Sequence, residues 1–378
     1  GEWNKCTIND LATVVGGGTP DTTVKSYWGG DIQWFTPSEI GKNKYVDFSL
    51  RTITRDGLDN SSAKLLPLHT ILLSSRATVG ECSIASNECT TNQGFQSLIA
   101  KQCNIDFLYY LIQTKKKDLI RNACGSTFLE ISANEIRKIK VAVPVQNEQE
   151  QIAKLLSLID ERIATQNKII EKLQSLIKGL VDELMTVLLK GKLYPFSSFY
   201  IKAGEGGTPT TSVVEYYTEG TIPFIKIEDL SCKYLTNNKD FITELGMQKS
   251  SAWLIPSKSV IYSNGATIGA ISINEYPVCT KQGILGIVPN TNINVEYLYL
   301  LMSSSYFSKE ISRIITEGTM KTAYLKDINH IKCPLPSMAQ QKNITNLTSS
   351  IEEKLSIEQE LLRFLNLQKQ YLLHMMFI

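Results

Sequence analysis

The sequence predicts an α+β fold in which two copies of a mixed, mostly β domain are joined by two long antiparallel helices. A series of short motifs occurs twice in the same order, 189 to 193 residues apart. Short β-branched runs separated by Gly, Pro, Asn and Ser fill each copy, as in domains built from short strands. Each copy precedes a long helical pattern with an apolar seam. The expected segments are 1–145 and 191–336 for the two domains and 146–190 and 337–378 for the helices.

The first domain, 1–145, shows strand-like runs at 31–36, 72–74 and 139–143 and one helical pattern near 105–123. Turn-forming motifs lie between these runs, beginning with Gly-Gly-Thr-Pro at 17–20. Pro144 ends the last run, because proline removes a ladder donor and starts a helix well.

The central helix, 146–190, carries apolar residues at alternating steps of four and three, the 3.5 period typical of a coiled coil. Its polar Gln166 is expected to fix register, as buried polar seam residues do. The seam comprises Ile152, Leu156, Ile159, Ile163, Gln166, Ile170, Leu173, Ile177, Leu180, Leu184 and Val187.

The second domain, 191–336, repeats the motifs of the first, which is the sequence signature of a duplicated unit. A second helical pattern lies near 294–315. The matched pairs are Gly-Gly-Thr-Pro at 17–20 and 206–209, Tyr-Trp at 27–28 and Tyr-Tyr at 216–217, the strand-like runs at 31–36 and 221–226, Ser-Ser-Arg-Ala-Thr-Val-Gly at 74–80 and Ser-Asn-Gly-Ala-Thr-Ile-Gly at 263–269, Thr-Asn-Gln-Gly at 91–94 and Thr-Lys-Gln-Gly at 280–283, and Gly-Ser-Thr at 125–127 and Gly-Thr-Met at 318–320.

The C-terminal helix, 337–378, opens on a repeat of the central helix, since Pro336 to Ile344 matches Pro144 to Ile152 at an offset of 192 residues. Its seam runs through Ile351, Leu355, Glu358, Leu362, Leu365, Lys369, Leu372 and Met376. Two seams of matching length suggest that each helix is the other's partner and that the pair acts as a spacer. The run Glu352-Glu353-Lys354 is expected to be solvated helix surface.

Composition indicates a folded cytoplasmic protein. The net charge is +2, from 39 basic and 37 acidic residues. If the chain binds nucleic acid, we therefore expect a partner protein to share the phosphate contacts. No run is long and apolar enough to span a membrane. The eight cysteines show no Cys-x-x-Cys pair and are expected to be reduced.

Motifs for chemistry are absent from the sequence. It has no Asn-Pro-Pro-[Phe/Tyr] for amino-methyl transfer, no Gly-x-Gly-x-x-Gly and no phosphate-binding loop. Three histidines outside His-Glu-x-x-His make a zinc site improbable. We therefore expect no catalytic residue, no metal and no cofactor.

The order of these motifs, occurring twice along essentially the whole chain, resembles the specificity subunit of type I restriction-modification systems. The motifs that carry the resemblance are Gly-Gly-Thr-Pro, Tyr-Trp, Ser-Ser-Arg-Ala-Thr-Val-Gly, Thr-Asn-Gln-Gly, Gly-Ser-Thr and the Pro-x-x-x-Glu-Gln that opens the long helix. The resemblance implies two target recognition domains, each reading one half of a split double-stranded DNA site, and a helix pair that sets the spacing. It also implies two methyltransferase subunits and ATP-dependent restriction subunits as partners.

Polar loop residues are the candidates for DNA contact. The Gly-Gly-Thr-Pro motifs have two interpretations. They could bring the backbone and the Thr19 or Thr208 hydroxyl close to a phosphate, or they could form tight turns without contacting DNA. Arg76 is the leading candidate to contact a base or a phosphate, because a guanidinium suits guanine bidentately. Its counterpart Gly265 predicts that the two domains read different bases. Asn92 and Gln93 suit adenine or cap a turn. In the first domain the candidates are Thr19, Tyr27, Trp28, Thr36, Ser38, Lys42, Lys44, Ser74, Ser75, Arg76, Asn92 and Gln93, and in the second Thr208, Tyr216, Tyr217, Lys226, Ser263, Asn264, Lys281 and Gln282.

Two other functional classes stay open at this point. A bivalent protein-binding scaffold with two similar heads is compatible with the near-neutral charge. A self-contained methyltransferase is disfavoured by the missing motifs. A non-catalytic DNA-recognition subunit is the function that the sequence favours.

Overall fold

The structure is a computed structural model that describes residues 3–125, 128–265, 267–315 and 321–377. It divides into two compact units, Gly1–Asn167 with Glu360–Ile378, and Lys168–Gln359. Each unit therefore combines a globular part with one half of each long helix, α6 (Gln146–Leu188) and α11 (Met338–Met376). The motif pair at 125–127 and 318–320 falls largely outside the described residues, as does Ala266.

The globular part of the first unit contains two mixed sheets and a small ribbon. The five-stranded sheet has the order β2-β9-β6-β7-β4, the three-stranded sheet β5-β3-β8, and β1 pairs with β10. Its elements are β1 (Asn4–Thr7), α1 (Ile8–Leu11), β2 (Ala12–Gly16), β3 (Trp28–Phe35), β4 (Tyr45–Val46), β5 (Arg51–Ile53), α2 (Arg55–Asp59), β6 (Ile71–Leu73), β7 (Cys82–Ala85), β8 (Cys89–Thr91), β9 (Gln96–Ala100), α3 (Ile105–Thr114), α4 (Lys116–Arg121), α5 (Ala133–Lys138) and β10 (Lys140–Val143).

The second unit repeats this topology strand for strand, in the orders β12-β19-β16-β17-β14, β15-β13-β18 and β11-β20. The predicted duplication and the α+β class are thereby confirmed. Its elements are β11 (Leu193–Pro195), β12 (Tyr200–Glu205), β13 (Ile222–Ile225), β14 (Tyr234–Leu235), β15 (Asp240–Ile242), α7 (Glu244–Gln248), β16 (Val260–Ser263), β17 (Ile271–Asn274), β18 (Cys279–Thr280), β19 (Ile284–Pro289), α8 (Val295–Ser303), α9 (Ser305–Ile314), α10 (Leu325–Ile328) and β20 (Lys332–Pro334).

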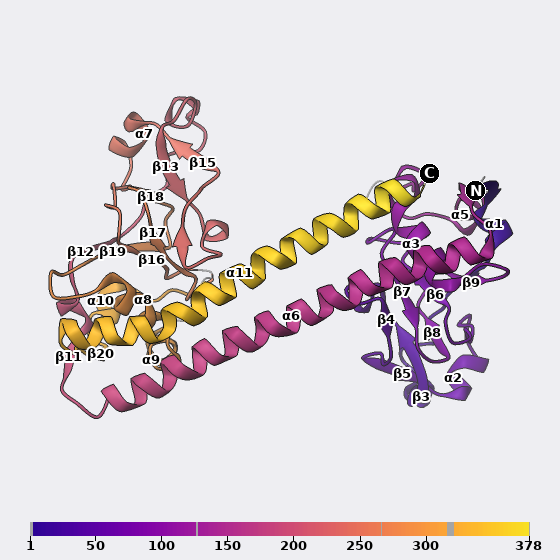
Figure 1. Ribbon diagram of the computed structural model, residues 1–378, viewed down its shortest axis with the longest axis horizontal. Helices are drawn as coiled ribbons and strands as arrows, with labels where there is room; N and C mark the ends of the chain where they lie inside the picture. Colours follow the sequence, from indigo (N-terminus) through magenta and orange to yellow (C-terminus); the bar gives the residue numbers. More distant parts are fainter. Residues whose placement is uncertain (1–2, 126–127, 266, 316–320, 378) are drawn as a thin grey trace. The chain divides into compact units, whose positions relative to one another are not determined.

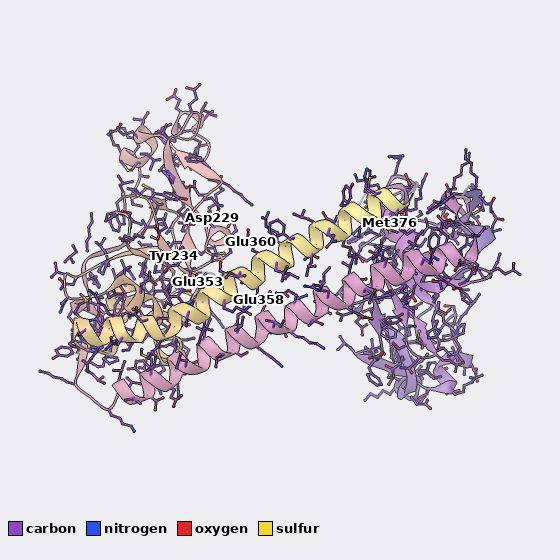
Figure 2. All side chains as sticks on the ribbon, viewed as in Figure 1. Asp229, Tyr234, Glu353, Glu358, Glu360 and Met376 are labelled. Carbon is purple, nitrogen blue, oxygen red and sulfur yellow. The ribbon has the colours of Figure 1, made fainter. Side chains whose placement is uncertain are left out.

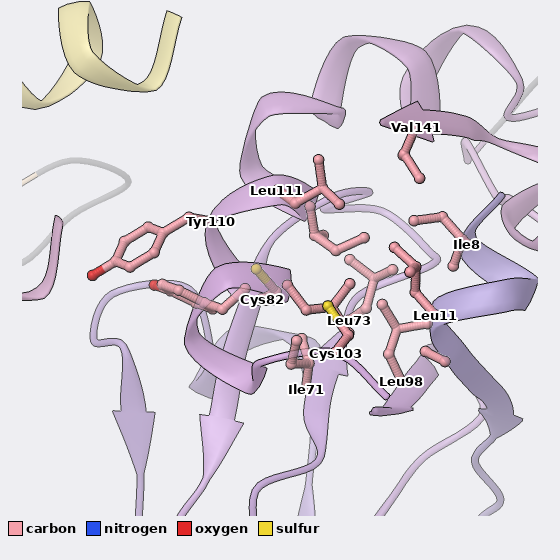
Figure 3. Packing of buried hydrophobic residues seen from close by; sticks show 14 of the residues in the cluster. Ile8, Leu11, Ile71, Leu73, Cys82, Leu98, Cys103, Tyr110, Leu111 and Val141 are labelled. Atoms are coloured by element: carbon pink, nitrogen blue, oxygen red, sulfur yellow. The ribbon is translucent and has the colours of Figure 1, made fainter. Parts of the chain in front are cut away.

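The main core of each unit lies between its five-stranded sheet, its first long domain helix and the adjoining part of α6 or α11. In the first unit, Ile71, Leu73 and Leu98 of the sheet pack with Leu111 of α3, and the Tyr110 side chain reaches the margin of the cluster (Figure 3). The three-stranded sheet lies at the end of each globular part farther from the long helices (Figure 1).

Each helix predicted after the sheets is broken into two. The pattern near 105–123 forms α3, which ends before Lys115, and α4, which begins after it. The pattern near 294–315 forms α8 and α9, with Ser304 between them. Ser304 leaves helical geometry and caps α9, since its side chain accepts from the Phe307 N–H. Apolar periodicity continues across such a break because both pieces contribute side chains to the same core.

The seam predicted on α6 is buried at Ile152, Leu156, Ile159, Gln166 and Ile170. Near the C-terminal end the prediction is wrong: Val187 is 61% exposed, while Val181 and Met185 are buried in the core of the second unit. A helix with 3.6 residues per turn drifts away from a strict 3.5 repeat, so the buried face moves around the helix.

The seam predicted on α11 is buried or half-buried throughout, with Glu358 and Leu365 buried. In the first unit the two helices run antiparallel, and Lys369 Nζ of α11 lies 2.7 Å from Asp160 Oδ1 of α6.

Glu353 and Glu358, labelled in Figure 2, lie on α11 in the second unit. The expectation of a solvated Glu352 is wrong, because this residue forms an ion pair with Lys233.

Candidate nucleic-acid interface

Four strands of the first globular part end at one edge. β3 and β8 are parallel, and β2 and β6 are both antiparallel to β9, so the carboxyl ends within each set lie together. Two backbone hydrogen bonds join the sets, from Gly18 N–H to Thr91 O at 2.9 Å and from Ser75 N–H to Gly94 O at 2.9 Å. The four predicted loops, at 17–20, 36–44, 74–80 and 91–94, consequently start from a common edge.

Side chains connect two of these loops directly. The Thr19 hydroxyl donates to Gln93 Oε1, and Asn92 Oδ1 accepts from the Gly94 N–H at 2.8 Å. The second domain repeats the arrangement, because Thr208 Oγ1 accepts from the Gln282 N–H at 3.4 Å. Sequence motifs 74 residues apart are thus brought side by side in both domains.

The glycines of the Gly-Gly-Thr-Pro turns are required by packing. A Cβ at Gly17 would lie 1.9 Å from Asn92 O, and a Cβ at Gly206 would lie 2.1 Å from Thr280 O. Only glycine allows the backbones to approach this closely. Of the two interpretations that the sequence left open, the structure provides a reason for the tight turn, and the phosphate interpretation stays a prediction for the Thr19 and Thr208 hydroxyls.

The predicted contact residues differ widely in exposure. Those with exposed side chains are Ser38, Lys42, Arg76, Gln93, Lys281 and Gln282. Those with partly exposed side chains are Thr19, Tyr27, Trp28, Thr36, Asn92, Thr208, Tyr216, Tyr217 and Lys226. Both sets lie on the polar loops or on the short turns beside them, except Trp28, which begins β3.

Four predicted residues are buried: Ser74, Ser75, Ser263 and Asn264. The Ser74 hydroxyl lies 2.9 Å from Thr78 Oγ1 inside its own turn, and Asn264 Nδ2 donates to Ala323 O at 3.1 Å. These residues lie at the ends of central strands, and their buried side chains offer no surface to a ligand.

Lys44 also differs from the prediction. Its ammonium lies 2.7 Å from Asp106 Oδ1 and 2.7 Å from Ser157 Oγ of α6, among the rings of Tyr45, Tyr109 and Tyr110. A cation held this way inside the protein is not available to phosphate. The equivalent Lys233 lies 2.6 Å from Glu296, pairs with Glu352 of α11, and lies 5.3 Å from the ring of Tyr234, which Figure 2 labels.

Arg76 remains the leading candidate of the first domain. Its guanidinium is about half exposed and lies 3.6 Å from Glu130, a distance that makes a loose ion pair. Ala77, the next residue, has a φ of 61°, so the loop turns sharply after Arg76. The equivalent position of the second domain is Gly265, which has no side chain to present.

The turn after β3 differs chemically between the domains. Thr36 caps it in the first domain, where Glu39 accepts from the Thr36 N–H at 2.7 Å. In the second domain Asp229 (Figure 2) accepts from the Lys226 N–H at 2.9 Å, and Lys226 Nζ pairs with Asp240 at 2.9 Å. The hydrogen bond with Asp240 is the main cause that raises the pKa of Lys226.

Sequence reasoning missed Arg51. Its guanidinium carbon lies 3.6 Å from the centroid of the Trp28 ring, at the same edge of the domain. No sequence motif marks this residue, because its position follows from the register that pairs it with Trp34 across the three-stranded sheet.

Two other properties of the described residues bear on function. Within the described ranges, no group of three or more His, Cys, Asp or Glu side chains is arranged to hold a metal ion. The helices of the described chain include none that is long and apolar enough to cross a bilayer.

The fold is that of a protein with two copies of a candidate recognition domain. Each copy has a polar loop edge, and long helices join the two. The family model of the type I restriction modification DNA specificity domain matches residues 1–175 and 199–366. The chain belongs to this family and is a specificity subunit with two recognition domains, as the resemblance implied.

Known relatives agree over most of the chain. The type I restriction enzyme MjaIX specificity subunit of Methanocaldococcus jannaschii is 29% identical, over 94% of this chain and 88% of its own length. The EcoR124I/EcoR124II specificity subunit of Escherichia coli is 26% identical, over 71% and 68%. The crystal structure of a type I S subunit from M. genitalium covers 100% of this chain and 96% of its own, with a TM-score of 0.56 and 18% identity, which supports the fold.

Proposed function

We propose that this chain directs a type I restriction-modification complex to a bipartite sequence in double-stranded DNA. Each recognition domain reads one half-site through the loop edge at the carboxyl ends of its strands, and α6 and α11 set the spacing between the half-sites. The observation that carries the proposal is that one scaffold, repeated strand for strand, presents unlike side chains at equivalent exposed positions, such as Ser38 and Glu228. Two domains with the same fold but different exposed loop side chains suit a DNA site whose two halves have different sequences.

Catalysis belongs to the partners in this proposal. Two methyltransferase subunits dock on the outward faces of the long helices, and ATP-dependent restriction subunits complete the complex. Large apolar side chains exposed on these helices support a docking role, because exposed apolar clusters are typical of binding surfaces. Examples are Leu158, Leu176, Leu347, Phe364 and Tyr371.

Shared phosphate contacts explain the small net charge of +2. Phosphate contacts provide most of the salt-dependent affinity for DNA, whereas base contacts provide discrimination. A subunit that discriminates bases while its partners supply much of the positive surface does not need a strongly basic composition.

The test is a map of methylated adenines in DNA from cells that express this chain with the methyltransferase encoded beside it. A bipartite motif with a fixed gap, lost when the chain is deleted, is the expected result. An active methyltransferase with the same methylation pattern in the absence of this chain would refute the proposal and favour the bivalent protein-binding scaffold.

A matched pair of variants separates the two half-sites. Gln93→Ala and Gln282→Ala remove exposed side chains at equivalent positions of the two loop edges. Each should relax base preference in one half of the motif only. A change in both halves from either variant would contradict the assignment of one half-site to each domain.

A further inference from the structure

Arg51 forms a stacked cluster with two tryptophans beside the loop edge of the first domain. Its guanidinium carbon lies 3.6 Å from the centroid of the Trp28 ring and 5.4 Å from that of Trp34. The two indoles meet edge to face, with centroids 5.0 Å apart. A cation over an indole face is held by the ring quadrupole, so the guanidinium has a fixed plane.

The aromatic platform is itself anchored to a loop of the candidate interface. Trp34 is buried and its Nε1 donates to Gly18 O at 3.0 Å, while Trp28 Nε1 donates to Asp21 O at 3.1 Å. Thr19, between these two acceptors, bonds to Gln93 on the next loop. Arg51 is therefore held next to the polar loop edge and belongs to the same surface.

The equivalent site of the second domain has opposite charge. There Asp240 takes the place of Arg51 and pairs with Lys226 at 2.9 Å, which neutralises the position. In the first domain, across the residues that the structure describes, no carboxylate lies within ion-pair distance of Arg51. This exposed cation is thus specific to one recognition domain.

The loop before β5 extends the same surface. Phe48 is 80% exposed and Leu50 is 88% exposed, and both precede Arg51 within three residues. The loop is fixed, because Glu39 Oε1 accepts from the Leu50 N–H at 2.6 Å and Ser49 Oγ accepts from the Trp34 N–H at 2.9 Å. Exposed apolar side chains on a fixed backbone, beside a stacked arginine, suit the faces and methyl groups of bases.

We propose that Arg51, stacked on Trp28, reads a guanine in the half-site of the first recognition domain, an inference that rests on the proposed function. Guanine presents O6 and N7 as paired acceptors in the major groove, which match the two parallel N–H donors of a guanidinium. Because the indole already fixes the guanidinium plane, less side-chain freedom is lost on binding. Phe48 and Leu50 contact the neighbouring bases.

The decisive experiment compares methylated-adenine maps from the complete complex carrying the wild-type chain, Arg51→Lys, Arg51→Gln or the control Arg55→Gln. Arg55 is an exposed arginine of the same domain that pairs with Asp59 within α2. Arg51→Lys retains the charge but not the bidentate fork. Both Arg51 variants should lose about tenfold to a hundredfold preference for one G·C pair of the first half-site, and Arg55→Gln should retain it. The second half-site should not change.

A further variant tests the stacking. Trp28→Leu removes the platform and should reduce the same preference at the same base pair, whereas Trp28→Phe retains a ring and should preserve most of it; thermal midpoints verify that each variant is folded. An unchanged motif with Arg51→Lys, or an equal loss over all sequences, would overturn the inference and leave the proposed function standing. A wild-type chain without a bipartite motif would overturn both.

Discussion

The Gln149 side chain, on α6, accepts a hydrogen bond through Oε1 from the backbone N–H of Asn104 at 3.0 Å. Asn104 is the N-cap of α3, and Gln149 Nε2 also donates to Pro144 O at 2.9 Å. The second unit repeats the relationship, because Gln341 Oε1 accepts from the Asn294 N–H at 2.7 Å. The repeated glutamine of the Pro-x-x-x-Glu-Gln motif thus fastens each long helix to the domain that precedes it.

Replacing this glutamine should destabilise the unit that contains it. Gln149→Met leaves the partly buried Asn104 N–H and the buried Pro144 carbonyl without their partner, which costs about 1–3 kcal/mol of unfolding free energy. Denaturant unfolding measures the loss, with Gln151→Met on the exposed face of the same helix as control. Equal stability of the two variants would contradict the assigned role.

The close approach at Gly17 predicts a different loss. Gly17→Ala places a methyl group against Asn92 O and should cost about 1–3 kcal/mol. Gly179→Ala is the control, since nothing lies within 4 Å of its Cβ, and alanine should stabilise α6 by about 1 kcal/mol. Loss of DNA binding by Gly17→Ala at unchanged stability would instead favour direct phosphate contact.

Lys44 should act on stability and not on base preference. Lys44→Met removes a mostly buried cation from Asp106 and Ser157 and should cost about 1–3 kcal/mol. A double-mutant cycle with Asp106→Asn measures the coupling. Lys42→Met, at an exposed position two residues earlier, should leave the unfolding free energy within about 0.5 kcal/mol of the wild type. A methylation motif altered by Lys44→Met in a fully stable protein would restore the original prediction of DNA contact.

Arg76 should determine preference at one position of the first half-site. Arg76→Ala removes a guanidinium that no side chain at Gly265 replaces, so the motif should relax at one base pair. The exposed Lys42, changed to alanine, should weaken binding uniformly across sequences instead. Full base preference in the Arg76→Ala complex, read from the same methylation map, would exclude this residue as a reader.

Buried thiols predict loss of stability at alkaline pH. Burial raises the pKa of Cys89 and Cys103 to about 12, from 9.0. The folded chain retains these protons where the unfolded chain releases them, so the stabilisation is complete below pH 9 and is lost as the pH rises toward 12.

Denaturant unfolding between about pH 8 and pH 11 measures this effect, with a slope of up to about 1.4 kcal/mol per pH unit for each thiol. Cys89→Ala should show a shallower dependence than the wild type. An unfolding midpoint that stays constant above pH 9 would contradict the prediction.

Much of the fold could be predicted because it depends on patterns that repeat. The duplicated motifs indicated two equal domains, and strand order is indeed the same in both. The long helices followed from apolar spacing, which reflects only which face is buried. The exceptions are exposed Val187 and the helix break at Ser304. At both positions the surface that packs against the core does not follow the apolar spacing of the sequence.

The candidate site was less predictable. The structure brings the four predicted loops of the first domain to a common edge, but motif membership could not distinguish exposed Gln93 from buried Ser75. Lys44 and Lys42 stand two positions apart in one polar loop, yet only Lys44 turns inward to Asp106 and α6. Exposure depends on which distant segment covers a side chain.

The sequence by itself determined the duplication, the two long helices, the family and the polar loops of each domain, because these depend on the spacing and order of residues along the chain. Tertiary structure alone decided which side chains of those loops face outward and which partners they have. Lys44 is enclosed by α6, and Arg51 is stacked on Trp28, because residues far apart in sequence meet through strand register and helix packing. Such long-range contacts leave no local pattern in the sequence.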